Sequence, residues 1–225
     1  MQIVITSCNE NKNKLSEPLL SCGVLTDARD GQNYKTVKIG DKCWMAENLN
    51  IGIMIDGQKN QTDNDTIEKY CYNNHSENCD IYGGLYQWHE IMQYTTGEKN
   101  QGICPEDWYV PSDNDWKKME IALGMSENDA NKENAWRGQN IGNALKKDGY
   151  TGFNVLFAGQ RTTSGDWAQI ENSEMEFAYF YTSTEAENDF LVWRRCFNAS
   201  QSSIGRFNTS SKNNGFSLRC IKDIN

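Results

Sequence analysis

The stretch Gln101–Trp116, QGICPEDWYVPSDNDW, constrains the fold more than any other part of this chain. It contains Cys104, two tryptophans and two of the three prolines. Ser112 lies three residues before Asp115, the spacing of a helix N-cap with an acidic group in the first turn. We therefore expect a helix to begin after Ser112, directly downstream of a fixed cysteine.

The predicted helix has an apolar face that must pack on another element. Trp116, Met119 and Leu123 recur at i, i+3 and i+7, the spacing of one side of an amphipathic helix. Gly124 follows as a natural stop. The strand-like run that ends the chain, 215–223, is the natural partner for this helix.

The eight cysteines indicate an oxidising compartment and a disulfide framework. No C-x2-C pair occurs and the chain has only two histidines, a composition that disfavours zinc. Cys71 and Cys79 bracket a short polar loop, and this spacing predicts a local disulfide. The run at the end of the chain carries Cys220, and a bond from Cys104 to Cys220 would close the chain on itself.

The acidic composition disfavours nucleic-acid binding. The net charge is −9, and no run of Lys and Arg is longer than two residues, whereas phosphate recognition requires clustered basic groups. No stretch approaches the ~20 consecutive apolar residues of a transmembrane helix. We expect no nucleic-acid partner, and membrane contact only through a lipid anchor.

The first residues leave two interpretations open. Ile5–Cys8 matches the end of a bacterial lipoprotein signal, in which the cysteine is acylated, but the apolar region before it is short and no basic segment occurs. Either a signal is truncated here or the match is accidental. We expect residues 1–26 to be a flexible arm, tethered through Cys8 in the first case, and residues 27–225 to form one domain.

Strand and helix signals are unevenly distributed along the domain. Tyr34–Ile39 and Lys42–Ala46 flank Gly40-Asp41 and predict a hairpin, whereas Tyr82–Met92 predicts a helix. A short helix is expected after Ser126 and a packed loop over 136–145. The expected late strands are 154–158, 178–182, 191–197, 205–208 and 216–221. Helices in the first half and strands in the second predict an α+β fold.

Several segments together resemble a known family. They are Asp30-Gly31 with Tyr34–Gly40, Cys43–Asn50, Tyr70–Asn74 with Cys79, Tyr82–Trp88, Gln101–Pro105 with Trp108, Pro111 and Ser112, Ala178–Glu185, and Gly215–Cys220. Over about residues 27–223 the chain resembles the Fibrobacter succinogenes major paralogous domain, which occurs in surface and secreted bacterial proteins. Tyr109 and Tyr181-Thr182 depart from the commonest family pattern, a difference that concerns fine packing rather than the fold.

The resemblance implies a fold related to C-type lectin-like and formylglycine-generating-enzyme-like domains. In such folds a cysteine before the first long helix bonds one in the last strand, which supports the Cys104–Cys220 pairing. The expected fold is an α+β, C-type lectin-like domain. It has two helices packed on short, mostly antiparallel strands with long loops, and it is stapled by disulfides.

The remaining cysteines allow more than one pairing. Cys43 and Cys196 both lie in apolar strand contexts, and a Cys43–Cys196 bridge is the preferred third disulfide. Cys22 is then free or pairs with Cys8. Spacing alone does not determine this connectivity, and a buried free thiol is the alternative for Cys43 and Cys196.

No catalytic signature supports an enzyme. A formylglycine-generating enzyme requires two closely spaced reactive cysteines near its C-terminus, whereas Cys196 and Cys220 are far apart in sequence. His89 has no nucleophile beside it, no G-x-S-x-G motif occurs, and the many carboxylates single out no glycosidase pair. We expect no catalytic residue and no cofactor.

Calcium is a separate question, because many C-type lectins bind it. The chain lacks the Glu-Pro-Asn, Gln-Pro-Asp and Trp-Asn-Asp motifs of those lectins, and it lacks the EF-hand pattern. The acidic residues that remain as calcium candidates lie in the loop Asp56–Asp65 and at the predicted helix start, Asp113 and Asp115. We expect no metal site, with calcium as the one ion left open.

The late β region carries the candidate ligand-binding residues, which are Glu185, Trp193, Arg194, Arg195 and Arg206. The resemblance implies that this region displays ligand-facing loops, and exposed Trp and Arg dominate binding surfaces. The alternative is that Trp193 belongs to the core and that one of the two adjacent arginines is paired and the other exposed.

These observations favour a non-catalytic recognition or adhesion module on a bacterial cell surface or outside the cell. The expected partner is a glycan or a protein. One alternative is a structural component of the cell envelope or of an appendage. The other is an enzyme, either of the formylglycine-generating-like superfamily or a carbohydrate hydrolase.

Overall fold

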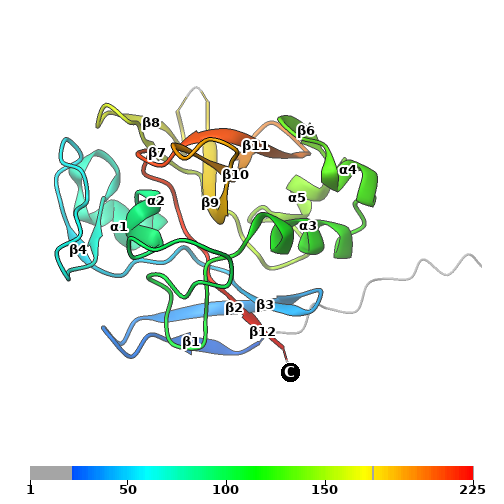
Figure 1. Ribbon diagram of the computed structural model, residues 1–225. Coiled ribbons are helices and arrows are strands. Elements are labelled where there is room, and N and C mark those ends of the chain that lie inside the picture. Colours follow the sequence, from blue (N-terminus) through cyan, green and yellow to red (C-terminus); the bar gives the residue numbers. More distant parts are fainter. Residues whose placement is uncertain (1–21, 174, 225) are drawn as a thin grey trace, which may run out of the picture.

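The first and last strands of the described chain lie in one sheet, at the bottom of the view in Figure 1. The structure is a computed structural model that describes residues 22–173 and 175–224. The sheet has the order β1-β2-β3-β12 and is antiparallel throughout. Its strands are β1 (Val24–Thr26), β2 (Asn33–Ile39), β3 (Lys42–Met45) and β12 (Ile221–Asp223). The predicted hairpin is confirmed, and Gly40 takes the positive φ of 65° that its two-residue turn requires.

A second, six-stranded sheet has the order β6-β11-β10-β9-β7-β8. Its strands are β6 (Ala135–Arg137), β7 (Ala158–Arg161), β8 (Trp167–Ile170), β9 (Phe177–Glu185), β10 (Leu191–Asn198) and β11 (Ile204–Ser211). All neighbours are antiparallel except β7 and β9. A small parallel pair joins β4 (Ile53–Met54) and β5 (Glu68–Lys69). The late strands expected over 178–182, 191–197 and 205–208 are confirmed within β9, β10 and β11.

Short helices lie at two places around the six-stranded sheet (Figure 1). In the right half of this view lie α3 (Asp113–Ala122), α4 (Glu127–Asn131) and α5 (Ile141–Leu145). In the left half lie α1 (Ser76–Tyr82) and α2 (Trp88–Ile91), and the 3-10 helix Tyr72–Asn74 comes directly before α1 in the chain. The predicted capping box of Ser112 and Asp115 is present at the start of α3. The fold is therefore mostly β, with few and short helices.

The helix predicted over Tyr82–Met92 is wrong for most of its length. Gly83 adopts φ of 79°, which ends α1, and the backbone amides of Leu85 and Tyr86 then donate to Tyr70 and Phe216. These long-range bonds replace the i−4 bonds of a helix, and only Trp88–Ile91 is helical. The apolar spacing that suggested a helix comes instead from an extended segment buried on both sides.

Helix α3 connects the cores of the two sheets. Its Trp116 packs edge-on against Trp44 of β3 with ring centroids 5.0 Å apart, and lies 5.7 Å from the ring of Phe180 in β9. All three side chains are fully buried. Aromatic rings of this kind supply much of the buried area in a chain with few aliphatic residues.

The disulfides confirm two predicted pairings and correct a third. Cys104–Cys220 and Cys71–Cys79 are both bonded. The predicted Cys43–Cys196 bridge is wrong, because Cys43 bonds Cys22 and Cys196 is a free, buried thiol. The physical reason is that Cys43 lies in β3 of the first sheet, whereas Cys196 lies in β10 of the second and packs against Gly205 of the neighbouring strand.

The Cys22–Cys43 bond also moves the boundary of the domain. Residues 22–26 were expected in the flexible arm, but Cys22 is bonded to β3 and Val24–Thr26 pairs with β2. The folded part thus includes residues from Cys22 onward. Cys8, the candidate lipidation site, lies outside the described residues.

Candidate functional site

Two of the predicted ligand-binding residues, Arg195 and Arg206, are buried under the six-stranded sheet. They pair directly across β10 and β11, and their guanidinium groups contact the carboxylates of Asp113 and Glu120 on α3. Arg137 of β6 reaches the same Glu120. We call these five residues the arginine cluster.

The arginine cluster is held by short, direct hydrogen bonds. Arg195 donates to Glu120 at 2.6 Å and to Asp113 at 2.7 Å. Arg206 donates to the two oxygens of Asp113 at 2.9 and 2.8 Å. Burial by itself would raise the pKa of Asp113, but the hydrogen bonds and charges of Arg206 and Arg195 outweigh it and lower the pKa to about 2. The cluster fastens α3 to the sheet and leaves neither arginine available on the surface.

The other three predicted residues are not brought together with them on one surface. Trp193 is buried, and the Arg206 guanidinium lies 3.7 Å from its ring centroid. Arg194 is half-buried and packs over the rings of Tyr179 and Phe207. Glu185 forms an ion pair with Lys212. The five side chains therefore do not share one exposed surface, and ligand binding by any of them stays a prediction.

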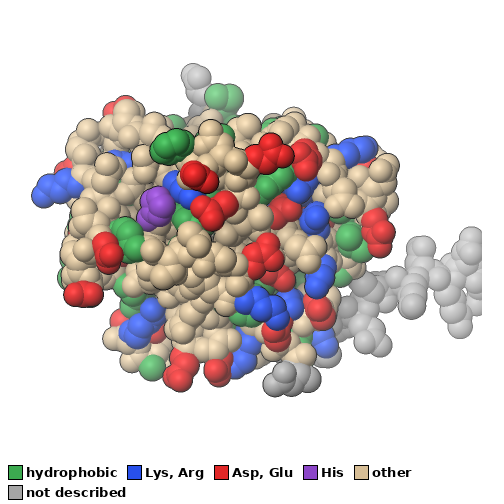
Figure 2. All heavy atoms as spheres, viewed as in Figure 1, with side chains coloured by type: hydrophobic (Ala, Val, Ile, Leu, Met, Phe, Trp, Pro, Cys, Tyr) green, Lys and Arg blue, Asp and Glu red, His purple; other side chains and the backbone are tan. Residues whose placement is uncertain are grey.

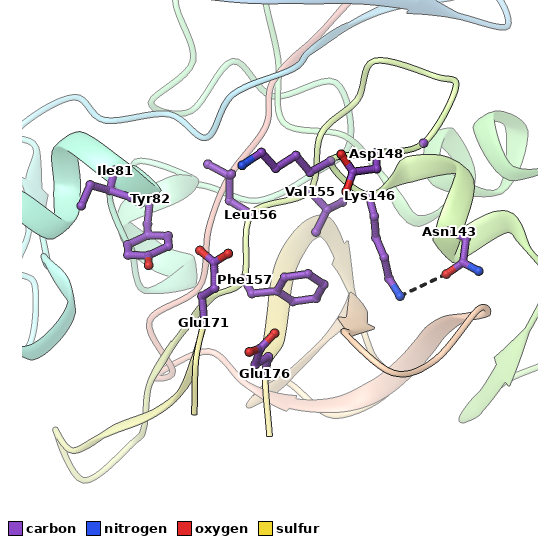
Figure 3. A pocket seen from close by; sticks show the side chains of 12 residues that line it. Ile81, Tyr82, Asn143, Lys146, Asp148, Val155, Leu156, Phe157, Glu171 and Glu176 are labelled. Carbon is purple, nitrogen blue, oxygen red and sulfur yellow. Dashed lines mark hydrogen bonds between the residues drawn. The ribbon is translucent and has the colours of Figure 1, made fainter. Parts of the chain in front are cut away.

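A pocket of about 480 Å³ lies between α1, α5 and the turn that joins β8 to β9 (Figure 3). Half-buried Tyr82 and Phe157 contribute aromatic rings to it, and Leu156 and Ile81 contribute aliphatic surface. Figure 3 shows the carboxylates of Glu171 and Glu176 extending into the space beside Phe157. Aromatic surface beside a few polar groups is the usual lining of a ligand site.

Local backbone bonds position the pocket's side chains. The amide of Val155 donates to the carbonyl of Leu145 at 2.9 Å, which lays the segment before β7 along the end of α5. The amide of Glu171 donates to the carbonyl of Phe157 at 2.8 Å, and the amide of Asn172 donates to Oε1 of Glu176 at 2.8 Å. The β8–β9 turn therefore holds both glutamates next to Phe157.

Lys146 closes the pocket on the side of α5. Its Nζ donates to the carbonyls of Ala199 at 2.9 Å and Gln201 at 2.7 Å, and to Asn143 at 3.2 Å. Burial lowers the pKa of Lys146. The ammonium group thus fixes the turn between β10 and β11 and is already satisfied by oxygen acceptors.

Two further pockets adjoin the central one and share lining side chains with it. The distal pocket, of about 550 Å³, shares Glu176 and adds Trp136, Phe177 and the turn 198–201. The proximal pocket, of about 120 Å³, shares Ile81 and Leu156. We call the proximal, central and distal pockets together the groove.

The electrostatics of the groove are mildly acidic. Burial and the neighbouring Glu171 carboxylate raise the pKa of Tyr82, so its hydroxyl remains a donor at neutral pH. Carboxylates line each pocket, and the lysines are Lys146 and Lys147 of the central one. On the face drawn in Figure 2, acidic and basic side chains are interspersed rather than gathered by sign.

Sequence reasoning missed the groove entirely. The residues of its central pocket alone come from four separate segments, and each segment alone resembles an ordinary loop or helix end. The sequence held two weak signals. One is Ile81, an apolar residue in a polar segment, which the structure shows to be 59% exposed. The other is the pair Glu171 and Glu176, which lie on either side of a turn in the same β region that Phe157 begins. Neither signal identifies a site without the tertiary contacts.

A metal cluster and a membrane-spanning helix are both absent from the part of the chain that the structure describes. In residues 22–173 and 175–224, no three His, Cys, Asp or Glu side chains converge to hold a metal ion. Across the same residues, none of the helices has the length and apolar character needed to span a bilayer.

Comparison with known proteins identifies the family. The family model of the Fibrobacter succinogenes major domain matches residues 37–222. No curated protein and no solved structure matches the chain. The matched region contains the six-stranded sheet, the helices and the central and distal pockets, and it covers most of the sequence. The chain belongs to the Fibrobacter succinogenes major domain family.

Proposed function

We propose that this domain is a non-catalytic recognition module that binds a glycan in the groove, on a bacterial cell surface. The central pocket carries the proposal, because it sets the rings of Tyr82 and Phe157 beside the carboxylates of Glu171 and Glu176. Sugar rings offer apolar faces that pack on aromatic side chains and hydroxyls that donate to carboxylates, each of which accepts up to about four hydrogen bonds.

A glycan fits the groove better than an extended peptide does. Peptides that bind by strand addition pair with free backbone groups at a sheet edge. In the central pocket, the amides of Gly149 and Glu171 already donate to Lys146 and Phe157 at 2.9 and 2.8 Å. Side chains must therefore make the recognition contacts, which suits a ligand that carries many hydroxyls and has no peptide backbone.

A C-type lectin-like fold and an extracellular location are parts of the same proposal. Helix α3 follows Cys104, and Cys104 bonds Cys220 directly before β12, which is the arrangement that the family resemblance implies. The three disulfides are consistent with an extracellular protein. A lipid anchor at Cys8 would hold the domain at the cell surface.

Glycan binding by the full chain tests the proposal. Plant and microbial polysaccharides on an array serve as probes, and isothermal titration calorimetry measures the affinity of the oligosaccharides that score. We expect Phe157→Ala to weaken binding about tenfold or more, since it removes a ring from the centre of the groove. The matched control is Phe190→Ala, which removes a ring that is 77% exposed and lies outside the groove.

Three outcomes contradict the proposal. One is a blank array combined with capture of a protein partner. Another is an equal loss of affinity in Phe157→Ala and Phe190→Ala. The third is cleavage of the bound oligosaccharide, followed by chromatography, because Glu171 and Glu176 would then act as a hydrolytic carboxylate pair.

A further inference from the structure

The central pocket of the groove adjoins both the proximal and the distal pocket, and this arrangement bears on the length of the ligand. We infer that the groove binds a neutral, linear glycan chain laid across three adjoining subsites. This inference rests on the proposed function and adds the class of glycan, its charge and its extended shape.

Shared side chains place the central pocket next to both of the others. Glu176 lines both the central and the distal pocket, and Ile81 and Leu156 line both the central and the proximal one. A ligand that fills the central pocket therefore touches the walls of both neighbours. Pockets of about 300–1,000 Å³ hold one small ligand, and the central and distal pockets each reach that size alone. A chain of sugars uses this length, whereas a single sugar leaves most of it empty.

The chemistry of the walls changes along the groove. The proximal pocket is polar and offers Asn33, Glu47 and Asp80. The distal pocket offers Trp136 and Phe177, whose ring centroids lie 6.3 Å apart. Sugars at the proximal end are therefore held mainly by hydrogen bonds, and sugars at the distal end mainly by contact with rings.

The charge of the groove selects a neutral chain. Glu47 and Asp80 line the proximal pocket, Glu171 the central pocket, and Glu176 both the central and the distal one. The ammonium of Lys146 is directed to backbone carbonyls, so it does not offset these carboxylates for a ligand. Lys147 is the exposed cation of the central pocket, and it faces the three carboxylates of Asp148, Glu171 and Glu176. A uronic acid or sulfated sugar would bring like charge against them, in a chain whose net charge is already −9.

Lys146 acts as a positioning residue for the distal subsite. Its hydrogen bonds to Ala199 and Gln201 hold the β10–β11 turn, and that turn forms one wall of the distal pocket. Replacing Lys146 by Met keeps most of the aliphatic stem and removes the three donors. The wall then loses its tether although no residue of the distal pocket itself has changed.

A chain-length series tests the inference with the full protein. Cello-, xylo- and manno-oligosaccharides from disaccharide to hexasaccharide are titrated by calorimetry, with oligogalacturonates as the acidic comparison. We expect affinity to rise by about tenfold from disaccharide to hexasaccharide in at least one neutral series, and no binding of oligogalacturonate. Trp136→Ala and Lys146→Met should each flatten this rise, Phe157→Ala should weaken every length, and Phe190→Ala should match the wild type.

The outcomes separate the inference from the proposed function. If affinity is independent of chain length but falls in Phe157→Ala, the inference is overturned and glycan recognition stands. If oligogalacturonate binds as well as the neutral chains, the charge argument is wrong. If none of the neutral series binds, the inference fails, and the array result decides separately whether the function fails with it. The Trp136 ring also contacts Phe207, so Trp136→Ala could fail to fold for a structural reason. In that case Lys146→Met still tests the distal subsite.

Discussion

The arginine cluster and the central pocket of the groove both adjoin the six-stranded sheet but differ in how far their polar groups are satisfied. Arg195 is fully buried, and its guanidinium group is used by two carboxylates. In the groove, Glu171 is exposed and Glu176 half-buried, and each keeps room for further donors. Residue type alone therefore does not reveal a binding surface, and the proposal of the groove rests instead on unused hydrogen-bonding capacity beside aromatic rings.

The contrast follows from the position of each set relative to α3. Side chains that face α3 are sealed from water, and buried charge is tolerated there only because each arginine meets a carboxylate. The groove is lined by loops and by the ends of α1 and α5 at the surface, where water competes for the same groups. Substitutions in the cluster should therefore change stability, and substitutions in the groove should change binding.

The largest expected effect is that of Arg195→Ala. It leaves Glu120 and Asp113 buried without their main partner, and we expect the free energy of unfolding to fall by about 3–5 kcal/mol. Urea denaturation followed by tryptophan fluorescence measures this change. A loss below about 1 kcal/mol would show that the cluster does not hold α3 on the sheet.

The second-largest effect is expected from acid, which should lower the free energy of unfolding by weakening the arginine cluster. The folded-state pKa of Asp113 is lowered to about 2 from the ordinary value of 3.8, so its ionised form stabilises the fold above pH 3.8, and this contribution is lost as pH falls through 3.8 towards 2. The contribution is about 2 kcal/mol at 1.36 kcal/mol per pKa unit. Urea midpoints measured across this window should drop steeply in the wild type and less steeply in Asp113→Asn. Parallel slopes in the two proteins would assign the acid sensitivity to other carboxylates.

A smaller effect, on binding rather than stability, is expected for Glu171→Gln in the groove. The amide keeps the shape of the side chain but loses the charge and one acceptor position, so affinity for the neutral oligosaccharides should fall by about tenfold. Calorimetric titration gives the affinity, and the urea midpoint of the same variant should equal that of the wild type. A stability loss without an affinity loss would place Glu171 with the structural residues.

The smallest expected effect is that of Lys147→Ala. This side chain is exposed at the edge of the central pocket, and its removal should change the free energy of unfolding by no more than about 0.5 kcal/mol. It serves as the stability control for Arg195→Ala, since each variant removes one positive charge. A loss comparable to that of Arg195→Ala would erase the distinction between the two regions.

Local signals in the sequence predicted the parts of the fold that depend on neighbours in the chain. The capping box at Ser112, the turn at Gly40-Asp41 and the short Cys71–Cys79 loop all act over a few residues, and all are confirmed. The family resemblance supported the long-range Cys104–Cys220 bond. Together they define the frame of the domain.

Long-range pairing explains the failures. The segment after Tyr82 has helical spacing, but its backbone bonds to Tyr70 and Phe216 far along the chain. Cys43 and Cys196 share an apolar context but lie in different sheets. Nothing local indicates that two arginines of the late β region turn inward to α3, or that four distant segments enclose the central pocket of the groove. These features arise from topology, which the pattern of single segments does not encode.

Amide chemical-shift mapping tests directly whether the ligand binds in the groove. A two-dimensional NMR spectrum of the labelled full chain is recorded with and without the tightest-binding neutral hexasaccharide. We expect shifts to concentrate at residues 81–82, 143–149, 155–157 and 198–201, with little change at 185 and 193–195. Shifts concentrated at 185, 193–195 and 206, with a silent groove, would contradict this expectation.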